Sequence, residues 1–108
     1  MLGPFEVGVV DFNIEPYRIG AYILTKNGRT AHYVGRSDDN LRERIKTSSH
    51  ERRSVNSPYT HFWFAYALSP DTAYRLECEW YHKYGPTDNM VHPACPAGRY
   101  IPCPVCGQ

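Results

Sequence analysis

The chain has 108 residues, of which 42% are hydrophobic and 14% aromatic, and its formal net charge is +1. This length fits one small domain and excludes two full hydrophobic cores. A net charge this close to zero argues neither for nor against a nucleic-acid partner. No segment is long and apolar enough to span a membrane, and residues 1–6 lack the basic start and apolar run of a secretory signal. We therefore predict a cytoplasmic or otherwise intracellular protein with no membrane partner. The sequence gives no indication of the oligomeric state.

The first predicted elements are strands. Phe5–Phe12 has strand-like composition, interrupted by a glycine, and predicts an edge strand. Ile19–Thr25 and Thr30–Val34 are both rich in β-forming residues. Asn27-Gly28 between them is the pair favoured in two-residue turns, so these runs predict a β-hairpin.

A helix is expected to follow the hairpin, from about Asn40 to Thr47 or beyond. Ser37–Asp39 supplies capping residues directly before it. Leu41, Ile45 and Ser48 fall on one side at helical spacing and predict its buried face.

The second half of the chain predicts a loop, a strand and a helix. Ser54–Pro58 is a polar loop, and His61–Leu68 is almost wholly apolar. This apolar run is too short for a typical helix and predicts a central strand covered on both faces. Ser69 and Pro70 are typical of a helix start, and a Gly-Pro pair after Tyr84 predicts its end.

The element order predicts an α+β domain with a three-stranded, mostly antiparallel sheet flanked by helices over residues 1–90. Residues 91–108 are dense in proline, glycine and cysteine. They predict a loop tail held together by something other than a core.

A paired motif lies within the predicted hairpin. Residues 20–22 are Gly-Ala-Tyr, in the first strand, and residues 33–35 are Tyr-Val-Gly, at the end of the second. Residues 40–44, Asn-Leu-Arg-Glu-Arg, follow in the loop and helix, and Glu77, Pro86 and Asn89 come later. This ordered set, spanning about residues 20–89, resembles the pattern of the GIY-YIG nucleases.

The resemblance implies a metal-dependent endonuclease that hydrolyses DNA phosphodiester bonds. One divalent ion, Mg²⁺, would bind Glu77, and either tyrosine of the motif would orient the attacking water. Arg44 would be the phosphate clamp, because its planar fork of donors suits a phosphate that gains charge. The implied catalytic residues are Tyr22, Tyr33, Arg44, Glu77 and Asn89.

The position of Glu77 supports this role independently. At about 100° per residue, Glu77 falls inside the apolar stripe of the second helix, whereas Glu79 falls outside it. The stripe consists of Ala73, Leu76, Trp80 and Tyr84. A carboxylate on a core-facing stripe is costly unless it is paired or binds a cation. The alternative to a metal ligand is a salt bridge, to Arg44 or Arg75.

Basic residues around the first helix are candidates for DNA contacts. Arg36, Arg42, Lys46 and His50 lie in or beside it, among several acidic residues. Arg36 directly follows the second motif and predicts a phosphate contact. The alternative for this stretch is a solvated helix face.

The tail has the spacing of a metal site. His92 and Cys95 form one pair with two intervening residues, and Cys103 and Cys106 form another. Four such ligands predict a structural Zn²⁺ site, and the Cys-Pro-Val-Cys-Gly run resembles the knuckle of zinc ribbons. Free thiols and disulfides are the alternatives. Cys78 lies off the apolar stripe and is not part of this set.

Two classes of function therefore remain open. The first is a nuclease with a structural zinc. The second is a non-catalytic nucleic-acid- or protein-binding module that retains the nuclease fold and the zinc. The presence of all five implied catalytic residues favours the first.

Overall fold

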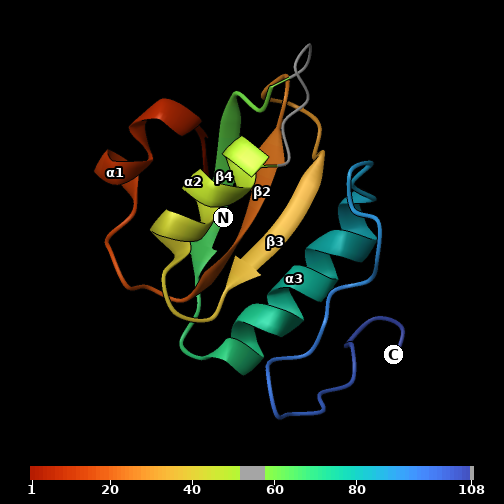
Figure 1. The fold of residues 1–108 in the computed structure, drawn as a ribbon. Helices are drawn as coiled ribbons and strands as arrows, with labels where there is room; N and C mark the ends of the chain where they lie inside the picture. The colour runs from red at the N-terminus through yellow and green to blue at the C-terminus, as the bar shows by residue number, and fades with distance from the viewer. Residues whose placement is uncertain (52–57, 108) are drawn as a thin grey trace.

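The computed structural model describes residues 1–51 and 58–107, which form a small α+β fold (Figure 1). Its elements are β1 (Leu2–Glu6), η1 (Val7–Val9), α1 (Val10–Asn13), β2 (Gly20–Thr25), β3 (Tyr33–Ser37), α2 (Leu41–Glu51), β4 (His61–Tyr66) and α3 (Pro70–Tyr84). The sheet has four strands and not the three predicted. The predicted loop Ser54–Pro58, apart from its last residue, lies outside the described residues.

The strands are ordered β1-β4-β2-β3, and every neighbouring pair is antiparallel. β4 is an interior strand, as its apolar sequence predicted. The expected edge strand exists, but it is Leu2–Glu6 and not Phe5–Phe12. Residues 7–13 are helical instead, because Val10 and Ile14, four residues apart, are both buried in the core.

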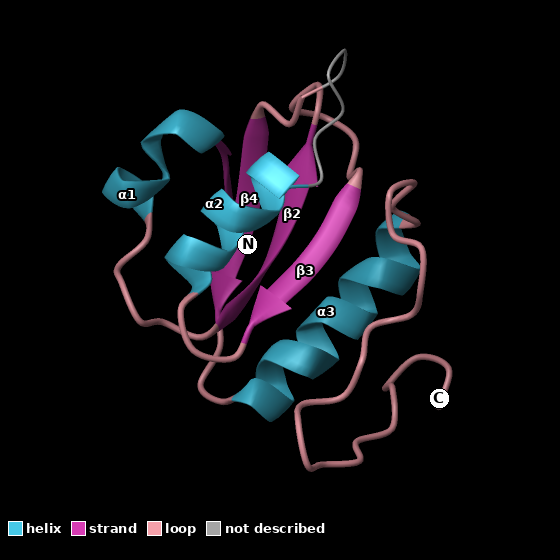
Figure 2. Ribbon diagram, viewed as in Figure 1, coloured by secondary structure: helices cyan, strands magenta, loops and turns pink. Residues whose placement is uncertain are grey.

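Helices cover both faces of the sheet. α1 and α2 lie on one face, and α3 lies beside β3 on the other (Figure 2). Successive side chains of β2 point to opposite faces of the sheet. Tyr22 and Leu24 therefore pack in the α2 layer, and Ala21 and Ile23 pack in the α3 layer. β2 is buried along its whole length.

The hairpin connection is longer than predicted. Residues 26–32 join β2 to β3, and the expected two-residue turn at Asn27 and Gly28 is wrong. The Asn27 side chain accepts hydrogen bonds from the backbone N–H groups of Arg29 and Thr30, both at 2.9 Å. An asparagine that caps the backbone two and three residues ahead builds a wider loop than a type I′ turn. β3 therefore begins three residues later than predicted.

The long helices follow their sequence signals. Leu41, Ile45 and Ser48 of α2 are buried against the sheet, as predicted. The Ser69 side chain caps α3 by accepting from the Thr72 N–H at 3.2 Å, and Gly85 ends it in a left-handed conformation at φ 53°. Within the described parts of the chain, no helix has the length and apolar character needed to cross a bilayer.

The tail packs back along α3 and covers a second side of it (Figure 1). Tyr74 and Cys78 of α3 form a small buried cluster with Ile101 and Cys103 of the tail. Cys78 lies off the stripe that faces the sheet, as predicted, and it packs against the tail instead. Cys78 is fully buried, by the tail.

Candidate active site

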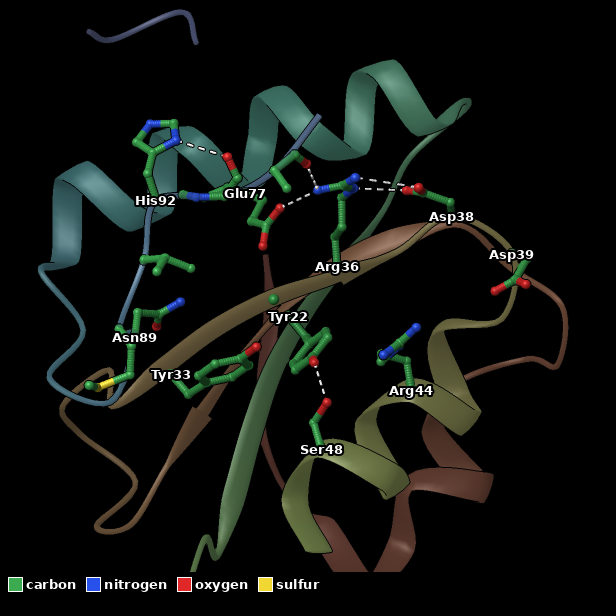
Figure 3. A pocket seen from close by; sticks show the side chains of 15 residues that line it. Tyr22, Tyr33, Arg36, Asp38, Asp39, Arg44, Ser48, Glu77, Asn89 and His92 are labelled. Carbon is green, nitrogen blue, oxygen red and sulfur yellow. Dashed lines mark hydrogen bonds and ion pairs between the residues drawn. The ribbon is translucent and has the colours of Figure 1, made fainter. Parts of the chain in front are cut away.

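A pocket of about 680 Å³ opens around the edge strand β3, between α2 and α3. It brings together residues from four separate elements and from the segment after α3 (Figure 3). All five predicted catalytic residues line it: Tyr22, Tyr33, Arg44, Glu77 and Asn89. The fold thus brings residues that lie between positions 22 and 89 of the sequence to one pocket.

Tyr22 is fixed in the floor of the pocket by Gly35 and Ser48. Tyr22 lies opposite Gly35 in the β2–β3 ladder, and its ring crosses the glycine so closely that a Cβ there would lie 2.5 Å from Cζ and Oη. Its hydroxyl lies 2.6 Å from the Ser48 Oγ, and the side chain is 1% exposed. The first tyrosine and the second glycine of the motif are therefore one packing unit.

Burial raises the pKa of the Tyr22 phenol, and the neighbouring Tyr33 raises it further. Arg44 lowers this pKa, but burial outweighs it. At neutral pH Tyr22 is a neutral phenol that donates or accepts hydrogen bonds.

The packing of Tyr22 on Gly35 leads to a stability prediction. We expect Gly35→Ala to lower the free energy of unfolding by about 1–3 kcal/mol, the usual cost of overpacking, because the Tyr22 ring has no room to retreat. Gly8→Ala is the matched control, since a Cβ at Gly8 meets nothing within 4 Å. Urea denaturation of both variants measures the difference. Equal stability of the two variants would show that the ring adapts freely.

Glu77 is held by Arg36. The Glu77 carboxylate is buried, and its Oε1 accepts a hydrogen bond from the Arg36 Nη1 at 2.7 Å. Burial raises the pKa of Glu77, and the Arg36 guanidinium opposes that shift. The second carboxylate oxygen points toward Tyr22 and Tyr33 (Figure 3). The salt bridge considered from the sequence exists, but its partner is Arg36 and neither Arg44 nor Arg75.

The contact of Arg36 with a DNA phosphate stays a prediction, and the structure shows which partners its guanidinium has within the protein. Its guanidinium also donates to Asp38 Oδ1 at 2.8 Å and to the Ala94 carbonyl at 2.6 Å, and its side chain is only 12% exposed. Together with Glu77, these partners accept from four of the five N–H donors of the guanidinium. Arg36 comes two residues after Val34 in β3, so both side chains point to the α3 side of the sheet. This position is the signal that made Arg36 a candidate partner of Glu77.

Arg44 has different surroundings. It lies on the exposed side of α2 at the mouth of the pocket, near Tyr22 (Figure 3). Among the described side chains, those of residues 1–50 and 58–107, its guanidinium forms no ion pair. A guanidinium with its donors directed to solvent at the edge of a pocket is available for an anionic ligand.

The other basic residues proposed for DNA contacts do not line the pocket. Arg42 and Lys46 lie on the side of α2 that faces α1, where both form ion pairs with Asp11. His50 borders a separate hollow beside Tyr59. Their role in DNA binding stays a prediction, and they are not part of the site.

Asn89 stabilises the outer edge of β3. Its Oδ1 accepts from the Val34 N–H at 2.9 Å, and its Nδ2 donates to the Val34 carbonyl at 3.0 Å. The Asp88 N–H donates to the His32 carbonyl at 2.7 Å, so the segment after α3 pairs with the edge strand. Asn89 therefore positions the strand that carries Tyr33 and Gly35.

We expect Asn89→Ala to cost about 1–3 kcal/mol of unfolding free energy, because both backbone groups of Val34 lose their partner. Asn89→Asp keeps the acceptor but loses the donor, so its cost arises at the Val34 carbonyl alone. Asn13→Ala, which removes a single exposed hydrogen bond, is the control. Chemical denaturation orders the variants, and a loss for Asn89→Ala no larger than that for Asn13→Ala would contradict the role assigned here.

The structure brings together three of the four predicted zinc ligands of the tail. The ligand atoms of His92, Cys103 and Cys106 lie together, but the fourth member is His82 of α3 and not Cys95. The Cys95 Sγ instead contacts the Ile101 carbonyl at 3.3 Å. All four cysteines are among the described residues, and none forms a disulfide. His82 was missed because it lies outside the tail, in the last turn of α3, where the Gly-Pro turn brings the chain back past it.

Comparisons with known proteins agree with this architecture. No protein-family model and no curated protein sequence matches the chain. Two solved structures do, both of the GIY-YIG N-terminal endonuclease domain of UvrC from Thermotoga maritima, one an asparagine-to-alanine and one a tyrosine-to-phenylalanine point mutant, each bound to its catalytic divalent cation. Each gives a TM-score of 0.57 at 19% identity, over 72% of this chain and 89% of the other. The chain therefore has the fold of a GIY-YIG endonuclease domain.

Proposed function

We propose that the protein is a metal-dependent endonuclease that hydrolyses DNA phosphodiester bonds. The observation that supports this most is the content of the pocket around β3. A buried carboxylate, two tyrosines and an exposed arginine meet there, in a fold shared with endonuclease domains that bind a catalytic divalent cation. Each of these groups has a distinct use in phosphodiester hydrolysis.

The residues present fit a single hard cation. Arg36 holds one oxygen of Glu77, and the other faces the pocket, so the carboxylate can offer one oxygen ligand there (Figure 3). Mg²⁺ takes oxygen ligands, keeps several waters and binds through one or two carboxylates, which suits one glutamate in a 680 Å³ pocket. When bound, the ion would polarise the scissile phosphate and stabilise the leaving oxygen.

The remaining residues position the substrate and water. Arg44 contacts the phosphate from the α2 side, where its charge-assisted hydrogen bonds strengthen as negative charge grows. The Tyr22 hydroxyl, fixed by Ser48, orients the attacking water as a neutral group, together with Tyr33 on the neighbouring strand. Arg36 orients Glu77, and Asn89 holds β3, so both are positioning residues.

One observation favours the second candidate, a non-catalytic binding module with this fold. The buried Glu77 is already paired with Arg36, so its burial alone does not demand a cation. In that case Arg44 and the pocket would bind nucleic acid or protein without chemistry.

Plasmid cleavage separates the two candidates. We expect the purified protein to nick supercoiled DNA with Mg²⁺ and to stop when EDTA is added. A mobility-shift assay on the same DNA gives binding independently. Binding without cleavage under Mg²⁺ or Mn²⁺ would overturn the nuclease proposal in favour of the binding module.

A further inference from the structure

Two histidines and two cysteines meet at the end of α3, beside the pocket. His82 comes from the last turn of α3, His92 from the segment that follows it, and Cys103 and Cys106 from the tail. One ligand atom from each lies within 4.8 Å of all the others. The His92 Nε2 is 3.3 Å from the His82 Nε2 and 3.5 Å from the Cys106 Sγ. We refer to these four residues as the tail cluster.

We propose that the tail cluster binds one Zn²⁺ ion, through two histidines and two cysteines, and that this ion fixes one wall of the pocket. A tetrahedral zinc with bonds of about 2.0 Å to nitrogen and 2.3 Å to sulfur places neighbouring ligand atoms roughly 3.3–3.8 Å apart. The two separations from the His92 Nε2, 3.3 Å and 3.5 Å, already lie in this range. Two thiolates neutralise the charge of the ion, and soft sulfur ligands select zinc over magnesium.

The surroundings of the tail cluster hold its ligands in a binding geometry. The His92 Nδ1 lies 2.9 Å from the Pro93 carbonyl, which leaves Nε2 directed at the cluster. The Tyr81 ring contacts both imidazoles edge-on, with centroids 5.2 Å from His82 and 5.4 Å from His92. The Val105 N–H points to the Cys103 Sγ at 3.4 Å, in a turn completed by Gly107 at φ 76°.

The tail has little else to order it. Between residues 93 and 107 only Pro96, Ile101 and Cys103 are buried. Three residues of modest size give a small apolar surface for a segment of this length. Metal binding therefore supplies a large part of the free energy that docks the tail on α3.

The ion is connected to the pocket by covalent and hydrogen-bonded neighbours. His92 belongs to the tail cluster and also lines the pocket, together with Ala94. The Ala94 carbonyl accepts from the Arg36 Nη1, the same nitrogen that donates to Glu77. A zinc ion on His92 thus holds in place the segment that helps Arg36 to orient the carboxylate.

The first test is metal content and coordination. We expect about one zinc per chain in protein purified without chelators, and X-ray absorption of the wild-type protein should show two sulfur and two nitrogen ligands. His82→Ala and Cys106→Ser should each lose the zinc, whereas Cys95→Ser should keep it. Loss of zinc in Cys95→Ser with retention in His82→Ala would overturn this ligand set in favour of three sulfurs. Wild-type protein without zinc would overturn the site itself.

The second test addresses the pocket wall. Hydrogen exchange of residues 89–95 should become faster in Cys106→Ser than in wild type, while exchange in β2 and β4 stays unchanged. Unchanged protection of residues 89–95 after zinc loss would show that the ion does not hold the wall. The wild-type zinc content does not depend on the proposed nuclease activity, so a failed cleavage assay leaves this inference intact. Glu77→Gln should retain its zinc, because Glu77 is not a ligand.

Discussion

Glu77→Gln is expected to reduce Mg²⁺-dependent plasmid cleavage by roughly 10³-fold or more, since a catalytic metal contributes several kcal/mol to the transition state. Glutamine keeps the shape of the side chain and an oxygen for Arg36, so folding and DNA binding should persist. Glu79→Gln is the matched control, because Glu79 lies two residues away on the same helix with its side chain in solvent. An inactive Glu79 variant beside an active Glu77 variant would overturn the assignment of the metal ligand.

The difference in unfolding free energy between Glu77→Gln and wild type should depend on pH. Burial, partly opposed by Arg36, holds the folded-state pKa of Glu77 above its ordinary value of 4.5. Ionised Glu77 therefore costs stability, and this cost is absent below the unfolded-state pKa and grows as pH rises through the folded-state pKa. We expect Glu77→Gln to gain stability relative to wild type from acid to neutral pH, measured by urea denaturation across that range. A constant difference would show that Glu77 titrates normally.

Arg44→Ala is expected to slow cleavage by about 10²- to 10³-fold, the usual cost of removing one donor to a charge that develops in the transition state. DNA affinity should fall far less. An exposed ionic contact is worth about 1 kcal/mol or less, which corresponds to roughly fivefold in Kd. Single-turnover cleavage with Mg²⁺ and fluorescence anisotropy in EDTA measure the two effects separately.

Arg42→Ala is the matched control for Arg44→Ala. It removes the same charge from the same helix, on the side that faces α1 and pairs with Asp11. Arg44→Lys should lie between alanine and wild type, because lysine keeps the charge and loses the planar fork. Parallel losses of affinity and cleavage in Arg44→Ala would mark the residue as an ordinary electrostatic contact.

The sequence predicted those parts of the fold that depend on neighbouring residues in the chain, such as helix caps and apolar runs. The start and end of α3 follow from Ser69 and the Gly-Pro pair, and the interior position of β4 follows from its apolar sequence. The width of the hairpin loop depends on whether Asn27 bonds its own backbone or adopts a tight turn, and composition does not distinguish these. β1 was placed too late because the residues that form it include a glycine and a proline.

The sequence predicted those residues of the candidate site that belong to the paired motif and its ordered neighbours. The five predicted catalytic residues come together because the motif spacing reflects a fixed packing of β2, β3, α2 and α3. The alternation of β3 made Arg36 a candidate partner of Glu77, but other arginines were also possible, and only the tertiary structure selects Arg36. His82 was missed for the same reason, because regular Cys/His spacing in the tail suggested a set of ligands complete in itself.

The two edge strands of the sheet affect how strongly the protein aggregates at high concentration. Exposed strand edges invite other chains to add strands, which leads to aggregates. At the β3 edge, Asn89 and Asp88 occupy backbone groups that another strand would need. At the β1 edge, Pro4 has no N–H to offer, and the ladder is irregular between Leu2 and Phe5. Asn89 thus has a second role beyond the pocket. It blocks the β3 edge, as Pro4 disrupts the β1 edge, and so hinders the sheets of two copies from pairing edge to edge.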